Sequence, residues 1–171
     1  LYTEMLNEAV TAIREGRIPD FDQTESIHAE VDLKIPALIP PNYLNDVPIR
    51  LELYKRISTA EDSESLSEIE IEMIDRFGLL PPQAKNLFHQ ALVRIQAESL
   101  GIKQITMGPQ SGRIEFREKT KVDPMKLIRL VQSKPNEYKL DGATAIKVIR
   151  SSVSTAQRLS LIGNILHLLG G

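Results

Sequence analysis

The order of the hydrophobic patterns along the chain is the feature that most constrains its fold. In the first half, apolar residues recur at helical spacing, which predicts helices over about 47–59, 64–77 and 81–100. In the second half, two short alternating segments surround turn signals and predict hairpins over about 104–117 and 138–149. Because no strand-helix-strand unit repeats, we expect an α+β fold, with a small mixed or antiparallel sheet of hairpins packed with several helices.

Capping residues define where several of these helices should begin and end. Asp46 is the expected N-cap of the first helix, and Asp123, followed by proline, predicts a further helix to about residue 133. Ser65 and Glu68 have the spacing of a capping box at the start of the second helix. Gly78 is expected to end that helix.

The two ends of the chain carry patterns of their own. Apolar residues at helical spacing predict a helix over 1–13, and the polar segment 17–26 is typical of a linker. Alternation over 29–35 predicts a strand, and a last amphipathic helix is expected over 155–169. Because the chain begins inside a helical pattern without an initiator Met, we expect it to be a fragment that continues into another domain.

The sequence lacks the signatures of most common active sites. The 171 residues carry a net charge of -2 and contain no cysteine, so disulfides, thiolate catalysis and Cys-ligated zinc are excluded. There is no phosphate loop, dinucleotide-binding glycine motif or serine nucleophile elbow. His28, His89 and His167 have no metal-ligand spacing, and no apolar run is long enough to span a bilayer. We therefore expect no catalytic, cofactor-binding or metal-binding residues; an enzymatic alternative is an unrecognised hydrolase with a paired carboxyl in a pocket.

A short basic cluster in the second half has two interpretations. Arg113, Arg117, Lys119 and Lys121 surround Phe116, a pattern typical of either a nucleic-acid surface or an edge strand protected by cations. The alternative function is therefore an accessory nucleic-acid-binding domain that uses Arg113, Arg117 and Lys121. Neighbouring acidic residues cancel much of the charge, which favours the edge strand.

The most informative segment is acidic. Between residues 61 and 75 there are seven Asp and Glu residues and no Lys or Arg. On a helix, one stripe is apolar and should face the core; it contains Leu66, Ile69, Met73 and Phe77. The opposite stripe contains Glu64, Glu68, Glu72 and Asp75, with Ile71 at its edge. Such a stripe is either a solvated charged face with one stray isoleucine, or an interface for a partner that bears arginines.

Five segments in order resemble one protein family. The blocks at 50–57 (RLELYKRI) and 71–81 (IEMIDRFGLLP), together with those at 31–36, 113–116 and 138–142, are similar to the C-terminal domain of the bacterial transcription-repair coupling factors, the Mfd family. The resemblance covers nearly the whole chain, and its IDRFGLLP block is quite specific.

The resemblance implies a place in a much larger protein. That protein would be an ATP-driven, helicase-like DNA translocase that pushes stalled RNA polymerase off DNA and recruits the excision-repair protein UvrA. ATP and magnesium would belong to its motor, with no cofactor in this domain, and its location would be cytoplasmic. Residues 1–25 would be a helix and linker from the motor domain, and residues 26–171 the C-terminal regulatory domain.

The resemblance also implies an autoinhibitory role. Such domains pack on the UvrB-like N-terminal domain of the same chain, hide its UvrA-binding surface and restrain the motor. Glu72 and Asp75 match the family positions that pair with arginines of the UvrB-like domain. The helical wheel adds Glu68 and Ile71. The predicted interdomain interface is therefore Glu68, Ile71, Glu72 and Asp75.

Overall fold

A computed structural model of the chain describes residues 28–170, which divide into two compact units. One unit consists of residues 36–92, and the other combines residues 28–35 with residues 93–170. The helix, the linker and the domain boundary predicted within the first 26 residues lie outside the described part of the chain.

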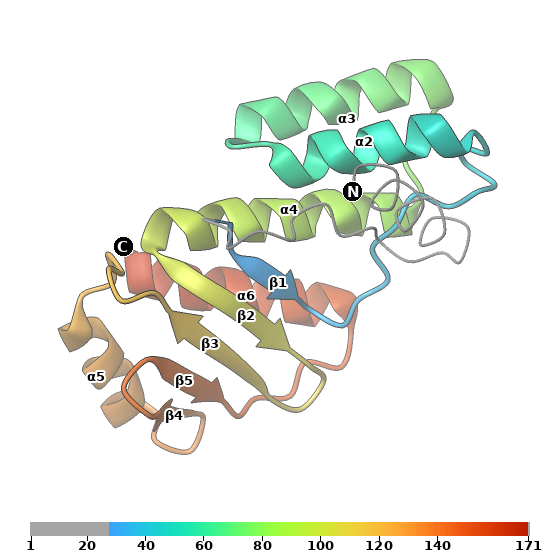
Figure 1. The fold of residues 1–171 in the computed structure, drawn as a ribbon. Helices are drawn as coiled ribbons and strands as arrows, with labels where there is room; N and C mark the ends of the chain where they lie inside the picture. The colour runs from blue at the N-terminus through green and yellow to red at the C-terminus, as the bar shows by residue number, and fades with distance from the viewer. Residues whose placement is uncertain (1–27, 171) are drawn as a thin grey trace, which may run out of the picture. The chain divides into compact units, whose positions relative to one another are not determined.

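The first unit is helical (Figure 1). It contains α2 (Val47–Thr59), α3 (Ser63–Phe77) and the first part of α4 (Pro82–Leu100), so the three predicted helices are confirmed. Helices α2 and α3 pack against each other through apolar residues at helical spacing. The buried apolar side chains of these two helices are Leu53, Tyr54, Ile57, Leu66, Ile69 and Met73.

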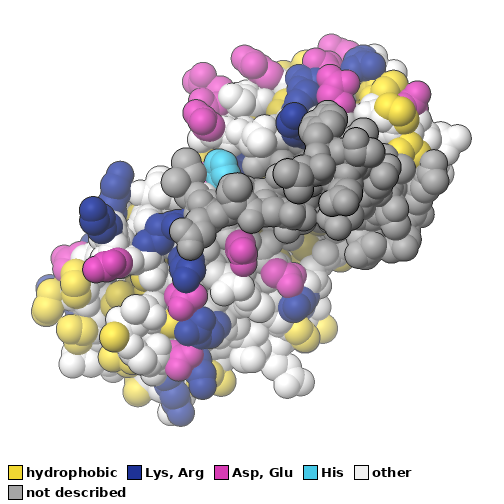
Figure 2. Space-filling model, viewed as in Figure 1, with side chains coloured by type: hydrophobic (Ala, Val, Ile, Leu, Met, Phe, Trp, Pro, Cys, Tyr) yellow, Lys and Arg dark blue, Asp and Glu magenta, His cyan; other side chains and the backbone are white. Residues whose placement is uncertain are grey.

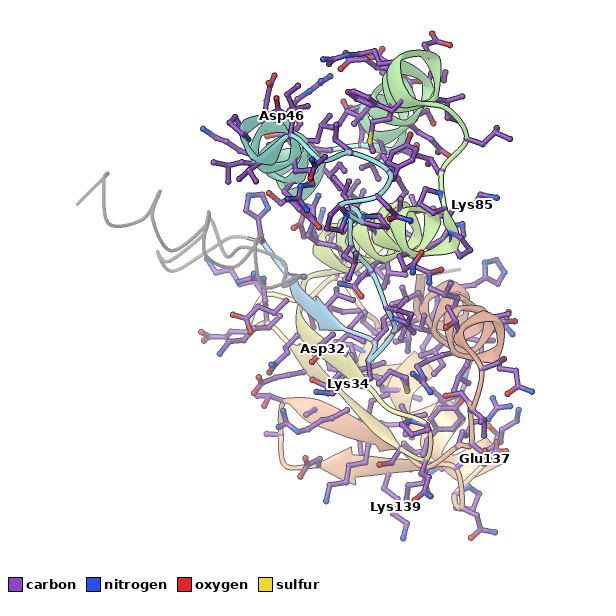
Figure 3. All side chains as sticks on the ribbon, turned by 90° about the vertical axis from the view of Figure 1, so that its right-hand side faces the viewer. Asp32, Lys34, Asp46, Lys85, Glu137 and Lys139 are labelled. Atoms are coloured by element: carbon purple, nitrogen blue, oxygen red, sulfur yellow. The ribbon has the colours of Figure 1, made fainter. Side chains whose placement is uncertain are left out.

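Polar contacts fix the loop that precedes α2. Asp46, labelled in Figure 3, is the N-cap of α2, and its carboxylate accepts a hydrogen bond from the Ile49 amide at 3.0 Å. The hydroxyl of Tyr54 accepts a bond from the Ile39 amide at 2.7 Å, and burial raises the pKa of Tyr54. The loop therefore has a defined path even though it contains no regular structure.

The predicted cap of α3 is wrong, whereas its predicted end is confirmed. Asp62, rather than Ser65, is the N-cap, because Asp62 has the extended backbone that a cap requires while Ser65 lies within the first turn. The carboxylate of Asp62 accepts a hydrogen bond from the Ser65 amide at 2.7 Å. At the other end, Gly78 has a φ of 96°, and its amide donates to the Ile74 carbonyl at 2.9 Å.

The second unit is built on a five-stranded sheet. Its strands are β1 (Glu30–Asp32), β2 (Ile102–Met107), β3 (Gly112–Phe116), β4 (Tyr138–Asp141) and β5 (Ala145–Val148). Their order across the sheet is β1-β2-β3-β5-β4, with β1 parallel to β2 and every other pair antiparallel. Both predicted hairpins and the mixed α+β fold are confirmed.

Two helices complete this unit. Helix α5 (Pro124–Ser133) begins after Asp123 as predicted, and α6 (Thr155–Gly170) runs behind the sheet (Figure 1). The core joins α6 to the strands through fully buried side chains that include Ile105, Ile114 and Ile162. The last helix therefore packs on its own unit.

A buried arginine ties β1 to α6. Arg158 is only 4% exposed, and its guanidinium donates to the carbonyls of Leu33 and Lys34 at 3.0 Å and of Ser152 at 2.6 Å. Lys34 has a φ of 54°, unusual for a residue with a side chain, and its ammonium lies 2.8 Å from the Asp32 carboxylate (Figure 3). The guanidinium thus satisfies backbone carbonyls where the chain leaves β1.

The prediction that the basic cluster lies on an edge strand is wrong for Arg113. Arg113 lies on β3, which pairs with β2 on one side and with β5 on the other and is therefore the central strand. Its guanidinium lies 2.7 Å from Asp141 and 3.8 Å from Glu115. Alternation alone places Arg113 on one face of a strand, but the strand order depends on long-range pairing that a local pattern does not contain.

Candidate interaction surface on helix α3

The outward face of α3 contains three of the four predicted interface residues as exposed side chains. Glu68, Ile71 and Asp75 are spaced by three and four residues and therefore share one face of the helix. Ile71 is 59% exposed, whereas Met73 on the opposite face is fully buried. The helix therefore presents an apolar side chain between two carboxylates.

The fourth predicted residue, Glu72, has partners within the same unit. Its carboxylate accepts hydrogen bonds from the two terminal nitrogens of Arg56 on α2, at 2.6 and 3.2 Å. Arg76, one turn further along α3, lies 3.4 Å away. The hydrogen bond from Arg56 is the main cause of a lowered pKa for Glu72. Folding therefore does not leave the carboxylate of this predicted interface residue free.

The C-terminal end of α3 is held by aromatic contacts. The guanidinium of Arg76 lies 4.8 Å from the centre of the Phe77 ring, and Tyr43 meets that ring edge-on at 6.3 Å. The Tyr43 hydroxyl donates to the Gly78 carbonyl at 2.7 Å. These contacts fix the position of the last turn and of the residue that follows it.

Leu79, the residue after Gly78, is a candidate that the sequence alone did not reveal. Leu79 is 84% exposed, the largest value among the exposed apolar side chains of the described residues, while its neighbour Leu80 is buried. An apolar pair directly after a helix stop is the signal that could have found it, because one member must point outward when the other enters the core. We name the set Glu68, Ile71, Asp75 and Leu79 the α3 surface.

The electrostatic character of this surface is acidic. Figure 2 shows Asp and Glu side chains gathered over α2 and α3. Neither Glu68 nor Asp75 forms an ion pair with any of residues 28–170. Exposed carboxylates can accept paired hydrogen bonds from guanidinium groups, and the apolar side chains can fill a shallow hollow beside them.

The other predicted candidates lie apart in the sheet-bearing unit. His28 forms a contact with Glu98 at 2.9 Å, and Arg117 donates to the His28 carbonyl at 3.1 Å. Lys121 is exposed, and Arg113 is held by carboxylates on its own sheet. Within residues 28–170, no three metal-ligating side chains are grouped to hold a metal ion. Every helix within residues 28–170 is too short or too polar to cross a membrane.

This fold matches that of a known kind of domain. A crystal structure of the C-terminal domain of a transcription-repair coupling factor superposes with a TM-score of 0.66 at 20% sequence identity. The match covers 83% of this chain and 94% of that chain. The chain is therefore a small α+β domain with the fold of that structure.

Sequence comparison gives the family. The TRCF domain family matches residues 33–127, more than half of the chain, and the chain belongs to that family. It is 41% identical over 167 residues to the transcription-repair-coupling factor of Haemophilus influenzae and 42% identical over 162 residues to that of Escherichia coli. These matches cover 98% and 95% of the chain but only 15% and 14% of the two relatives, so the chain spans about one seventh of their length.

Proposed function

We propose that this chain is an autoinhibitory protein-interaction domain of a longer transcription-repair coupling factor. In this proposal, the α3 surface docks on arginine side chains of a UvrB-like domain nearer the N-terminus of the same protein. Docking covers the surface that binds UvrA and restrains an ATP- and magnesium-dependent DNA translocase that displaces stalled RNA polymerase. The whole protein acts in nucleotide excision repair in the bacterial cytoplasm, and this domain contributes contacts rather than catalysis.

One observation carries the proposal. Ile71 is 59% exposed between Glu68 and Asp75, and neither carboxylate has an ion pair within residues 28–170. A solvated helix face does not require an exposed isoleucine, whereas an interface with arginines gains from apolar contact beside the charges. Leu79, which follows the end of α3, is a second exposed apolar side chain.

The expected free energy of docking is small enough for the contact between the two domains to be reversible. An exposed carboxylate–arginine pair contributes about 0.2–1 kcal/mol. Two such pairs with some apolar burial supply a coupling of about 1–3 kcal/mol. Because both domains belong to one chain, the local concentration of the partner is on the order of millimolar, so weak contacts keep the closed state dominant. A competitor such as UvrA can then displace the domain.

Glu72 has a supporting role in this proposal. Arg56 and Arg76 hold its carboxylate, so Glu72 fixes α3 against α2 and orients the surface that α3 presents. Reversing its charge would place three cations together and disturb the unit itself. The test should therefore change Glu68 and Asp75, which have no such partners among the described residues.

The experiment measures UvrA binding by the full-length protein. Glu68→Arg with Asp75→Arg should raise UvrA affinity about 5- to 150-fold, the range that corresponds to this coupling. The matched control is Glu61→Arg with Glu118→Arg, which makes the same charge change at exposed positions outside the surface. Circular dichroism of each variant checks that the domain remains folded.

The outcomes separate clearly. A rise in UvrA affinity that occurs only in Glu68→Arg with Asp75→Arg supports the proposal. Equal UvrA affinity in both folded double variants and the wild-type protein would contradict it. An equal rise in both double variants would show that net charge, rather than the α3 surface, controls access, and this result also counts against the proposal.

A further inference from the structure

A second surface, in the other unit, combines an apolar floor with a cationic rim. Helices α5 and α6 border a groove of about 460 Å³. Leu130, Leu168 and Leu169 form its floor, and Leu168 is 54% exposed. Lys126 and Arg129 line the side formed by α5. The groove therefore has the hollow apolar base and polar edge that are typical of a helix-binding site.

The two helices that border this groove carry cations and no carboxylates. Neither α5 nor α6 contains an Asp or Glu residue. The acidic residues that flank α5 are already engaged: Asp123 caps the helix by accepting from the Met125 amide at 3.0 Å, and Glu137 lies 3.8 Å from Lys134 and 3.7 Å from Arg150. Figure 3 labels Glu137 near the start of β4. Positive charge therefore dominates the rim.

Helix α5 also exposes two apolar side chains that are not part of the groove lining. Met125 is 52% exposed and Ile128 is 39% exposed. Hydrophobic side chains gather over this helix in Figure 2.

We propose that the groove between α5 and α6 binds an acidic amphipathic helix of a partner protein. Leucine-sized side chains at helical spacing would enter the floor beside Leu168, and Asp or Glu side chains on the flanks would pair with the cations that α5 places along the rim, Arg129 above all. This site is separate from the α3 surface and of opposite charge, and it does not depend on the autoinhibitory role proposed for α3.

The chemistry of the floor favours a protein helix over a nucleic acid. Nucleic-acid surfaces that hold single strands use aromatic side chains on which bases stack, and duplex binders use cations that reach phosphates. The floor here is aliphatic, formed by three leucines. Aliphatic side chains in a groove match the apolar face of an amphipathic helix instead.

The test uses a synthetic probe and the 171-residue chain. The probe is a fluorescein-labelled peptide of about five helical turns, with leucines on one face and glutamates on its flanks. Fluorescence anisotropy at physiological salt should give saturable binding with a Kd on the order of 100 µM, because a small groove supports weak association. The same peptide with lysines in place of its glutamates should bind at least about tenfold more weakly.

Paired variants locate the site. Arg129→Glu should weaken binding about fivefold and Leu168→Gln about tenfold, because the first reverses the rim and the second makes the floor polar. Lys147→Glu and Leu140→Gln make the same changes at exposed positions on β5 and β4, outside the groove, and should leave binding unchanged. Both groove positions are exposed, so we expect all four variants to fold.

Several results would overturn the proposal. Absence of peptide binding would do so, and so would equal weakening by Lys147→Glu, which would indicate general electrostatic attraction. A duplex oligonucleotide that binds more tightly than the peptide and is lost in Arg129→Glu but not in Leu168→Gln would assign the surface to nucleic acid. Self-association in sedimentation equilibrium that Leu168→Gln abolishes would make a second copy of the chain the occupant.

Discussion

The two units of the chain carry opposite net charges. Residues 36–92 contain nine acidic and five basic residues, a net charge of -4. Residues 28–35 and 93–170 together contain eight acidic and fourteen basic residues, a net charge of +6. The chain-wide value of -2 therefore conceals two units of opposite charge, and net charge is informative only when it is counted unit by unit.

The same two units treat a buried arginine differently. Arg158 in the sheet-bearing unit and Arg50 in the helical unit are each 4% exposed. Arg158 donates to carbonyls from two segments, 33–34 and 152–153, whereas the guanidinium of Arg50 makes no hydrogen bond to any of residues 28–170 and its Nε is buried without a partner. Arg158 therefore stabilises its unit by satisfying buried carbonyls. Burial of Arg50 without a partner for its Nε lowers the stability of the helical unit.

The largest expected effect sharpens this contrast. Arg158→Met should lower the free energy of unfolding by about 3 kcal/mol, because it leaves several buried carbonyls without donors. Urea unfolding followed by circular dichroism measures the change. A loss of stability below about 1 kcal/mol would mean that water replaces the guanidinium as a donor. The hydrogen bonds of Arg158 would then contribute little to stability.

The corresponding change in the helical unit should have a much smaller effect. Arg50→Met removes an unsatisfied buried donor and keeps most of the side-chain volume, so stability should stay within about 1 kcal/mol of wild type or rise. The same urea titration applies. If Arg50→Met were as damaging as Arg158→Met, the comparison between the two arginines would fail.

The smallest effect concerns pH. Hydrogen bonding to Arg56 lowers the pKa of Glu72 in the folded state, so this carboxylate stabilises the fold above its unfolded pKa. That contribution is lost as the pH falls through the lowered folded value. Glu72→Gln should therefore reduce stability slightly at pH 7 and reduce the difference between pH 7 and pH 3, as measured by thermal melting.

A matched control keeps this measurement specific. Glu68→Gln removes a carboxylate from the same helix that has no ion pair within residues 28–170. It should reduce stability at pH 7 less than Glu72→Gln does, because it breaks no ion pair. Identical curves for Glu72→Gln and the wild-type protein would show that the pair with Arg56 contributes no net stability, as many exposed pairs do.

The helix and hairpin elements could be predicted from the sequence because their signals are local. Asp46, Gly78 and the pair Asp123-Pro124 each define a helix end through a neighbouring backbone group, and the structure places all three ends as expected. The α3 cap was misassigned because Asp62 and Ser65 are both good capping residues only three positions apart.

The parts that could not be predicted depend on tertiary contacts. A helical wheel gives the face of α3 on which Glu72 lies but not the register of α3 against α2. The pairing of Glu72 with Arg56 therefore could not be predicted from the sequence. The central position of β3 likewise depends on strands far apart in sequence. The exposure of Leu79 follows from the way the turn after Gly78 buries Leu80 instead.

The most direct test of the central claim is chemical labelling at Ile71. The chain contains no cysteine, so Ile71→Cys introduces a single exposed thiol in the α3 surface, and Leu140→Cys introduces one at a comparably exposed position on β4. Labelling rates with a maleimide, read by peptide mass spectrometry, are compared between the 171-residue chain and the full-length protein. Docking of α3 predicts at least about a fivefold slower reaction at position 71 in the full-length protein and no change at position 140. Equal rates at position 71 in the two proteins would contradict it.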